Sequence, residues 1–261
     1  MKISKIFLYD EPTVPEININ KLANFIKKTF AIDTIARKNI FSGVDQTICK
    51  QLASCRVFNT RRPFEFHSPS SEEIEFEKKS CQNTSNIENI IMYDGFEFQK
   101  TVSNLISENE KSSDSFHLIF TNRLTCTYDF NDYRYHGRAI ICSNPSVIST
   151  TGIVEAPAKP REYYMELISN MVQGLNLESI KKKYQGTYLE YHDERISNVV
   201  EGYAMQAIFY YLTGEPFCEQ LECRLFNAHW QKDLIYSQIE SAKLCERHQK
   251  NLNNLVFNLN S

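Results

Sequence analysis

The sequence predicts an α/β fold with a helical C-terminal part. Short apolar runs bounded by polar residues, beginning with residues 3–9, are typical of buried strands. Apolar residues at helical spacing recur between these runs, and the clearest helical pattern covers residues 195–214. Because strands and helices alternate early and helices dominate late, the order of elements favours an α/β or α+β domain.

The N-terminal part is predicted to contain two strands and two helices. The run ISKIFLY at residues 3–9 indicates the first strand. Residues 15–30 indicate the first helix, because a proline opens the segment and the apolar residues that follow have mostly helical spacing. Residues 31–37 and 42–58 then indicate a second strand and a second helix.

The middle of the chain predicts a polar insertion followed by strands. Residues 59–90 are rich in serine, asparagine, glutamate and lysine, which is typical of a long loop or insertion. The apolar runs 115–124 and 138–144 indicate strands, joined by the aromatic and polar connection 127–137. Residues 146–152 indicate another short strand.

The C-terminal part is predicted to be helical. A proline opens the helix expected over residues 160–175. The strongest helix covers residues 195–214 and ends at Gly214, where a C-cap is expected. Residues 231–257 indicate a final helix with a break near Cys245.

Composition and charge argue against several classes of partner. The chain has 261 residues, 42% of them apolar, and a formal net charge of −3. A nucleic-acid-binding surface is usually basic, so we expect no nucleic-acid partner. No window approaches the ~20 apolar residues of a membrane span, and the N-terminus turns acidic after one short apolar run. We therefore expect a soluble cytoplasmic protein without a signal peptide or a membrane partner.

Three of the eight cysteines have the spacing of metal ligands. Cys218 and Cys223 are separated by four residues, and Cys245 is separated from His248 by two. The other five cysteines are scattered, and in a reducing compartment we expect them to be buried thiols rather than disulfides. The simpler alternative for the three spaced cysteines is that they are buried thiols as well, beside a surface histidine.

These four residues predict one structural zinc site. Tetrahedral zinc takes cysteine thiolates and histidine nitrogens, and short pairs let one turn of backbone present two ligands to one ion. A closed set of four ligands leaves no open position for chemistry, so we expect one zinc per chain that stabilises the fold. His229 lies between the two pairs and is a rival for the fourth position, although the pairing with Cys245 favours His248.

The same segment resembles the C-terminal half of the archaemetzincins, which are metzincin zinc peptidases. Their pattern runs H-E-x-x-H-x-x-G-x3-C-x4-C-x-M and, after a spacer, C-x-x-C. Gly214, Cys218 and Cys223 fall in register with this pattern, and Cys245 with His248 takes the place of the closing pair. The chain also looks like a family of archaeal metallopeptidase-like proteins through STTGIVEAPAKPREYY and LTGEPFC. The resemblance implies a metzincin-like mixed sheet with an active-site-type helix.

The chain departs from that pattern at the catalytic residues. In H-E-x-x-H the two histidines bind zinc and the glutamate acts as general base. Counting back from Gly214 places Ala207 and Tyr211 at the histidine positions and Ile208 at the glutamate position, while Phe217 stands where a third histidine would fall. We therefore expect no catalytic residue at these degenerate positions. The resemblance then implies a former cleft that residues of the helix line or plug: Tyr203, Ala207, Tyr210 and Tyr211.

A second metal site built from other histidines is an open alternative. His192 lies among acidic residues just before the long helix, and His136 lies between two arginines. His117 begins a predicted strand, and His229 lies between the cysteine pairs. The simpler interpretation of the acidic residues near His192 is that they favour the positive N-terminus of the helix, with the histidine on the surface.

The resemblance implies a single metzincin-like domain over residues 1–261. Its expected parts are a strand and helix part, a polar insertion, a sheet and helix region, and a helix with the structural zinc subdomain: residues 1–58, 59–90, 91–194 and 195–261.

Three functions from different classes remain open. The favoured one is a non-catalytic metzincin relative with one structural zinc, which binds a peptide or protein in the former cleft or acts as a regulatory module. The second is an active zinc hydrolase with a rebuilt metal site. The third is a zinc-stabilised interaction domain without a functional tie to peptidases. A second metal would favour the hydrolase, and one zinc without peptide binding would favour the interaction domain.

Overall fold

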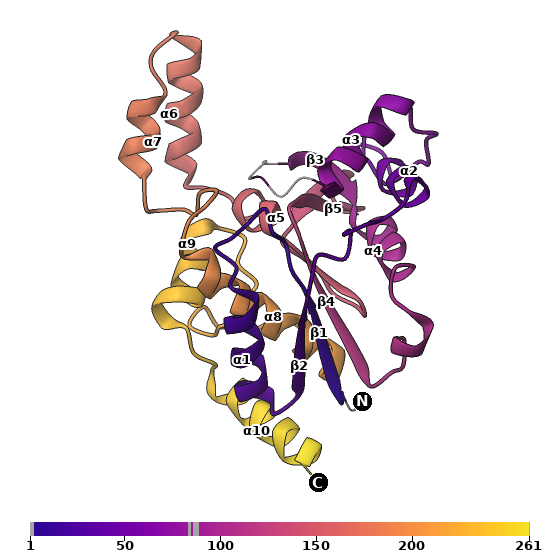
Figure 1. Cartoon of the computed structure of the whole chain (residues 1–261). Helices are drawn as coiled ribbons and strands as arrows, with labels where there is room; N and C mark the ends of the chain where they lie inside the picture. The colour runs from indigo at the N-terminus through magenta and orange to yellow at the C-terminus, as the bar shows by residue number, and fades with distance from the viewer. Residues whose placement is uncertain (1–2, 83–84, 86–88, 261) are drawn as a thin grey trace.

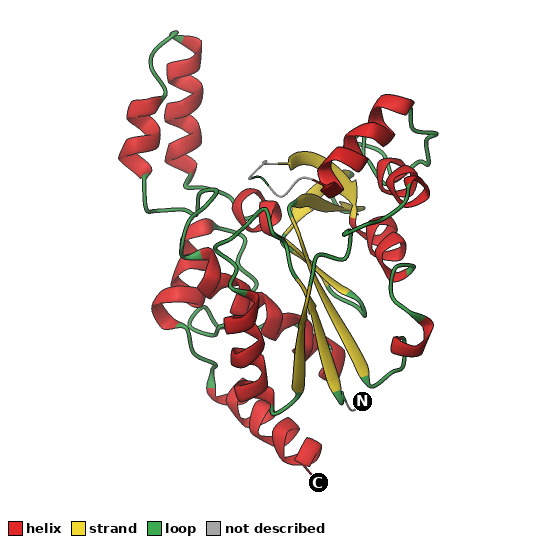
Figure 2. Cartoon of the chain, in the orientation of Figure 1, coloured by secondary structure: helices red, strands yellow, loops and turns green. Residues whose placement is uncertain are grey.

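A five-stranded sheet forms the centre of the computed structural model, which describes residues 3–82, 85 and 89–260. Neighbouring strands run parallel except at one edge, where β7 pairs antiparallel with β8. The sheet order and strand bounds are β2 (Asp33–Arg37), β1 (Lys5–Tyr9), β4 (Ser115–Thr121), β8 (Ser146–Ser149) and β7 (Ile140–Ile141). The predicted α/β class and the mixed sheet are confirmed (Figure 2).

A smaller sheet of three strands lies beside the first. The strands are β3 (Asn89–Asp94), β5 (Arg123–Asp129) and β6 (Arg134–Arg138). β3 and β5 run parallel, whereas β5 and β6 form an antiparallel hairpin. One residue, Asn122, separates β5 from β4, so the chain passes directly from the large sheet into the small one.

Helices cover both faces of the large sheet (Figure 1). Along β1, Ile6 and Leu8 point to one hydrophobic cluster while Phe7 and Tyr9 point to the other, as strand geometry requires. The first cluster includes residues of α1 (Ile19–Phe30) and α8 (Ile196–Thr213). The second includes residues of α2 (Gln46–Ser54) and α4 (Gly95–Ser103).

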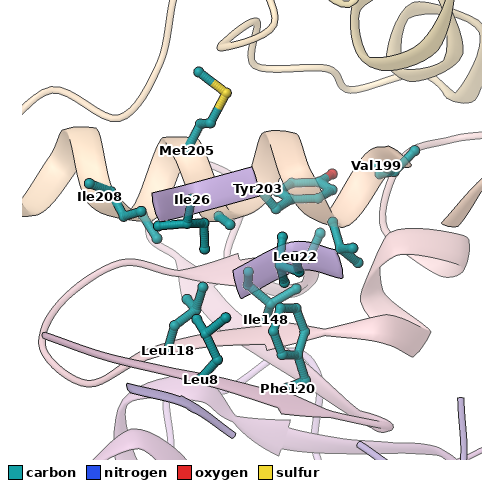
Figure 3. Close-up of a cluster of buried hydrophobic side chains, with 14 of the residues drawn as sticks. Leu8, Leu22, Ile26, Leu118, Phe120, Ile148, Val199, Tyr203, Met205 and Ile208 are labelled. Carbon is teal, nitrogen blue, oxygen red and sulfur yellow. The ribbon is translucent and has the colours of Figure 1, made fainter. Parts of the chain in front are cut away.

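The first cluster shows how α1 and α8 are fixed on the sheet. Leu22 and Ile26 of α1, one helical turn apart, lie between the sheet and α8 (Figure 3). The side chain of Asn18 caps α1 by accepting a hydrogen bond from the Lys21 N–H at 2.9 Å. α8 is buried along most of its length, and Gly214 ends it with a φ of 81° that a residue with a side chain rarely adopts.

Between β8 and α8 the chain forms a helical hairpin that projects from the rest of the molecule. After α5 (Thr150–Glu155), α6 (Arg161–Val172) and α7 (Glu178–Tyr184) stand side by side at the top left of Figure 1. The base of the hairpin is tied to the segment after α8, because Ala158 donates to His229 O and accepts from Gln231 N, both at 2.8 Å.

The predicted final helix is divided, and the expected break near Cys245 is confirmed. α9 (Gln231–Ile235) continues into a π-helical turn (Tyr236–Ser241), and α10 (Glu246–Asn260) begins immediately after Cys245. The left-handed conformation of Ala242, with a φ of 49°, ends the π-helical turn. The chain therefore turns sharply before α10, which brings Cys245 back toward the segment that follows α8.

The segment 59–90, predicted as a long polar loop or insertion, contains a helix that the prediction did not include. Residues Ser71–Gln82 form α3, preceded by an irregular stretch, and β3 begins at Asn89. Part of this polar pattern belongs to a buried ion network. Fully buried Glu77 accepts hydrogen bonds from Arg56 and Tyr93 (both 2.7 Å) and from Arg123 (3.0 Å). The remaining positions 83–84 and 86–88 lie outside the described residues.

The prediction for residues 115–152 needs three corrections. The single strand expected over 115–124 is two strands, β4 and the start of β5, because the chain changes sheets at Asn122. The connection expected over 127–137 is mostly the β5–β6 hairpin, in which Tyr128 and Tyr135 are paired across the two strands with ring centroids 5.4 Å apart. The strand expected over 146–152 ends at Ser149, whose hydroxyl accepts a hydrogen bond from the Gly152 N–H at 2.8 Å and so starts α5.

Candidate functional site

The structure brings the four predicted metal ligands together in one buried cluster. The candidate ligand atoms of Cys218, Cys223, Cys245 and His248 all lie within 4.8 Å of one another. Two come from the segment that follows α8, one precedes α10, and His248 lies in the first turn of α10. Three of the four residues are buried and Cys245 is half-buried. Local spacing in the sequence therefore becomes a single three-dimensional site.

Backbone hydrogen bonds hold the two halves of the cluster in register. Cys218 N donates to Leu225 O at 2.8 Å, which folds the segment after α8 back on itself. Next to Cys223, Arg224 N donates to Lys243 O at 2.7 Å and joins this segment to the stretch before α10. Gln249 N donates to Cys245 O at 2.8 Å and begins α10. The ligand positions are thus fixed by the backbone as well as by packing.

The distances within the cluster fit one tetrahedral zinc ion. Zinc bonds of about 2.3 Å to sulfur and about 2.05 Å to nitrogen place two sulfurs about 3.8 Å apart, and a sulfur and a nitrogen about 3.5 Å apart. Here the Sγ atoms of Cys218 and Cys245 are 3.9 Å apart. His248 Nδ1 lies 3.5 Å from Cys223 Sγ and 3.2 Å from Cys245 Sγ. The residues present therefore fit a Cys3His zinc site.

Hydrogen-bond donors around the sulfurs favour the thiolate form that a metal needs. Gln220 N lies 3.4 Å from Cys218 Sγ, and Cys245 N lies 3.4 Å from Cys223 Sγ. Burial raises the pKa of the Cys223 thiol to about 12. Burial also acts to raise the pKa of Cys245, but hydrogen bonds from the backbone of His248 and the thiol of Cys223 outweigh it and lower that pKa. Of these two thiols, Cys245 is therefore the one that loses its proton more readily.

The imidazole of His248 is held in the orientation of a ligand. Burial, with Arg247 as a second cause, lowers the pKa of His248 and so favours the neutral form that binds metals. The ring packs edge-on against Phe209 of α8, with ring centroids 5.8 Å apart. The outer nitrogen, Nε2, lies 3.2 Å from an Arg247 nitrogen. With Nδ1 on a metal, Nε2 carries the proton, so this exposed arginine would turn toward Glu215.

The other histidines lie outside this cluster. His117 is buried in β4, between the Tyr9 hydroxyl at 3.1 Å and Glu110 O at 2.9 Å. His192 pairs with Glu16 at 3.3 Å on the surface. His229, the rival ligand, is exposed and lines a cavity beside α8. None of these three histidines belongs to a group of metal ligands among the described residues.

His136 belongs to a second, exposed group of candidate ligands. Ligand atoms of Asp129, Asp132 and His136 on the β5–β6 hairpin lie within 4.8 Å of one another. Asp132 Oδ2 lies 2.7 Å from Arg134 Nε, and His136 Nε2 lies 2.9 Å from Oδ2 and 3.0 Å from Oδ1 of the same carboxylate. Both of its oxygens are thus engaged, and the arginine opposes binding of a cation. This group accordingly has the character of a surface ion-pair network.

A cavity of about 440 Å³ lies between α8 and the edge strand β7. One wall consists of the strand and its flanks, residues 137–142. The opposite wall consists of Tyr203, Gln206 and Tyr210, which follow one another along one face of α8. The segment that carries Cys218 and Cys223 closes the cavity through Phe217 and residues 226–229. The cavity is of the size that holds small ligands or short peptide segments.

The cavity-facing positions of α8 differ in part from the predicted ones. Tyr203, Tyr210 and Phe217 line the cavity, which agrees with the expected cleft. Ala207 and Ile208 are 0% exposed and belong to the core, so they neither line nor plug it. Tyr211 packs on Phe116 with ring centroids 5.0 Å apart, and its hydroxyl donates to Ser113 O at 2.7 Å.

Sequence reasoning missed Gln206 and Cys142, which line the cavity together with Arg138. Gln206 is a polar residue inside the otherwise apolar and aromatic run 202–212 of α8, and that signal could have indicated the face of the helix that borders the cavity. Its Nε2 donates to Phe226 O at 3.2 Å, which ties α8 to the segment that closes the cavity. Burial raises the pKa of the Cys142 thiol to about 12. This thiol therefore stays protonated near neutral pH.

Among the described residues, no helix is both long enough and apolar enough to cross a membrane.

Comparisons with known proteins show the family to which the chain belongs. A model of the family described as "Probable metallopeptidase family (DUF6775)" matches residues 2–255. A search of curated proteins finds no match. Among solved structures, the chain is similar to the crystal structure of a zinc-dependent peptidase from Methanocorpusculum labreanum (strain Z), with 9% identity and a TM-score of 0.46. That match covers 95% of this chain and 100% of the other. The family match spans both the cysteine cluster and the cavity.

Proposed function

Because the chain belongs to this probable metallopeptidase family, we propose that it is a peptide- or protein-binding member with one structural zinc and no catalytic metal. The observation that carries the proposal is that metal ligands and cavity occupy different places. The four residues of the Cys3His cluster are not among those that line the cavity. A hydrolytic zinc needs an open coordination position that faces the substrate, whereas four protein ligands close the ion.

The structural zinc would support the cavity rather than act in it. Zinc bound to Cys218, Cys223, Cys245 and His248 would fasten the segment after α8 to the start of α10. Phe217 and residues 226–229 of that same segment line the cavity. The backbone bond from Cys218 N to Leu225 O couples the metal ligands to this wall. Loss of the ion would therefore loosen one side of the cavity.

The edge strand offers a means of binding an extended peptide. Within the described part of the chain β7 pairs with one strand, β8, and residues 139–142 line the cavity. An extended peptide can add to a free sheet edge through main-chain hydrogen bonds, while neighbouring pockets receive its side chains. Aromatic residues of α8, Tyr203 and Tyr210, stand across the cavity from this edge and provide an apolar surface for such side chains.

The proposal is tested by measuring hydrolysis, peptide binding and metal content on the same preparation. We expect one zinc per chain, retention of peptides from a random library, and no cleavage of fluorogenic peptides. Cleavage that a chelator abolishes, together with two metals per chain, would instead support an active hydrolase with a rebuilt site. For that alternative, His229 at the cavity and His136 with its two aspartates are the candidate ligands. One zinc without peptide retention would support a zinc-stabilised interaction domain.

A further inference from the structure

Among the described residues that line the cavity, Arg138 is the one with a permanent charge, although the whole chain carries a net charge of −3. Arg138 lines the cavity from β6, and His229 lines it from the segment after α8. Among the described residues that line it, none is an aspartate or a glutamate. The remaining lining residues are mostly aromatic, aliphatic or small. The cavity thus combines an apolar surface with a positive charge, which favours an apolar ligand that also carries an anionic group.

Arg138 differs from the other shielded arginines of the molecule. Six arginines of the described chain are buried or half-buried, and five of them form ion pairs with carboxylates. Those five are Arg37, Arg56, Arg123, Arg195 and Arg224. Arg138 is the exception, since within the described residues its guanidinium has no carboxylate partner. A guanidinium presents a planar fork that matches a carboxylate, so this exception marks a position where such a group would bind.

The guanidinium of Arg138 is held in place without a counterion. Its Nε donates to Thr127 Oγ1 at 2.7 Å, which leaves the two terminal nitrogens for another partner. The backbone is fixed as well, because Arg138 O accepts a hydrogen bond from Thr125 Oγ1 at 3.0 Å. Gly152 packs so closely against Arg138 O that a Cβ there would lie 2.2 Å from it. Such fixation reduces the entropy that the side chain would lose on binding a ligand.

We propose that the cavity binds a carboxylate of a peptide ligand through Arg138, with an apolar side chain of the ligand against the aromatic wall formed by Tyr203, Tyr210 and Phe217. This inference rests on the proposed peptide-binding function and names its ligand class. The carboxylate is either the C-terminus of the peptide or an acidic side chain, since both present the same two oxygens. β7 and Arg138 border the same cavity, so a peptide that adds to this edge can bring a carboxylate to the guanidinium.

Affinity selection with three synthetic tetrapeptide libraries tests the inference. The libraries have free C-termini without acidic residues, amidated C-termini without acidic residues, and amidated C-termini with glutamate fixed at one position. We expect retention of the first or the third library by the wild-type protein, and the retained one identifies the source of the carboxylate. Equal retention of the amidated library without acids would overturn the carboxylate inference while leaving peptide binding intact. Retention of none would overturn both proposals.

Variants of Arg138 complete the test with peptides taken from the retained library. Arg138→Gln removes the charge but keeps most of the length, and we expect binding to weaken about ten- to hundredfold. Arg138→Lys keeps the charge but loses the fork, so it should restore only part of the affinity. Arg62→Gln makes the same change at an exposed arginine outside the cavity and should leave binding unchanged. Equal affinity of Arg138→Gln and wild type, with unchanged melting temperature, would refute the role of Arg138.

Discussion

Two regions that adjoin α8 differ in what their residues can bind. In one region Phe209 packs against His248 of the Cys3His cluster, where four ligand atoms converge. In the other, Tyr203, Gln206 and Tyr210 border a cavity whose lining holds no such group among the described residues. A metal site requires several donors within a few ångströms, whereas a ligand site requires a concave surface and a few placed polar groups. This contrast indicates that metal binding and ligand binding are separate properties of the molecule.

The metal cluster and the cavity are joined by one segment of the chain. One segment, Pro216–His229, contributes ligands to the cluster and wall residues to the cavity. A change at the cluster should therefore reach the cavity through this segment, whereas a change at the cavity wall should leave the metal in place.

The largest effect is expected for Cys223→Ser. This buried residue offers one of the four ligand atoms, and structural zinc contributes on the order of 10 kcal/mol to folding in small zinc domains. We expect zinc content near zero, a loss of several kcal/mol in the free energy of unfolding, and weaker peptide binding. Chemical denaturation with metal analysis measures the first two effects. Cys142→Ser, a half-buried cysteine outside the cluster, should keep its zinc, and loss of zinc there would contradict the assigned ligand set.

A smaller loss of stability is expected for Gly202→Ala. A Cβ at Gly202 would lie 1.6 Å from Gln238 Oε1. Gln238 Nε2 donates to Arg224 O at 2.7 Å, so its displacement would strain the segment that joins the cluster to the cavity. Overpacking of this kind typically costs about 1–3 kcal/mol of stability. We expect a lower melting temperature with zinc retained. A melting temperature equal to that of the wild type would show that this contact is not tight in solution.

Phe217→Ala should separate ligand binding from metal binding. The side chain lines the cavity next to Cys218, and its removal takes away apolar contact area without touching a ligand atom. We expect peptide affinity to fall about tenfold, stability to change by less than about 1 kcal/mol, and zinc content to stay the same. Fluorescence polarisation with a retained peptide measures the affinity. Phe130→Ala, at an exposed phenylalanine of the β5–β6 hairpin, is the matched control and should bind as the wild type does.

The smallest effect is expected for Asp132→Asn in the exposed group on the β5–β6 hairpin. Its pairs with His136 and Arg134 are solvent-exposed, and such pairs contribute about 0–1 kcal/mol. We expect no change in metal content and none in peptide binding. Elemental analysis after dialysis decides the matter. Loss of one metal equivalent would mean that the hairpin holds an ion. The Cys3His cluster would then no longer account for all metal binding.

The metal cluster could be predicted from the sequence because its information is local. Four residues separate Cys218 from Cys223 and two separate Cys245 from His248, and each pair lies near a helix end or start. Zinc chemistry then requires the two pairs to meet. The α/β class could be predicted for a similar reason, since short apolar runs and helical spacing are visible within single segments.

The rest depended on contacts between distant parts of the chain. Residues 71–82 resemble a solvated loop in sequence. Their buried residue Glu77 is paired with Arg56 and Arg123, which lie far from it along the chain. α8 is apolar on nearly every side, so its pattern does not show which face borders the cavity. Counting from Gly214 therefore placed Ala207 and Tyr211 at the cleft. In the structure the sheet edge and the segment after α8 face Gln206 and Tyr210 instead.

The most direct test of the account is the metal content per chain, measured by elemental mass spectrometry on the wild-type protein and on Cys218→Ser. We predict one zinc in the wild type and close to none in the variant, because the four ligand atoms form one closed site. Two zincs, one of which survives the substitution, would contradict a protein without a catalytic metal. No zinc in a carefully prepared wild type would contradict the Cys3His site itself.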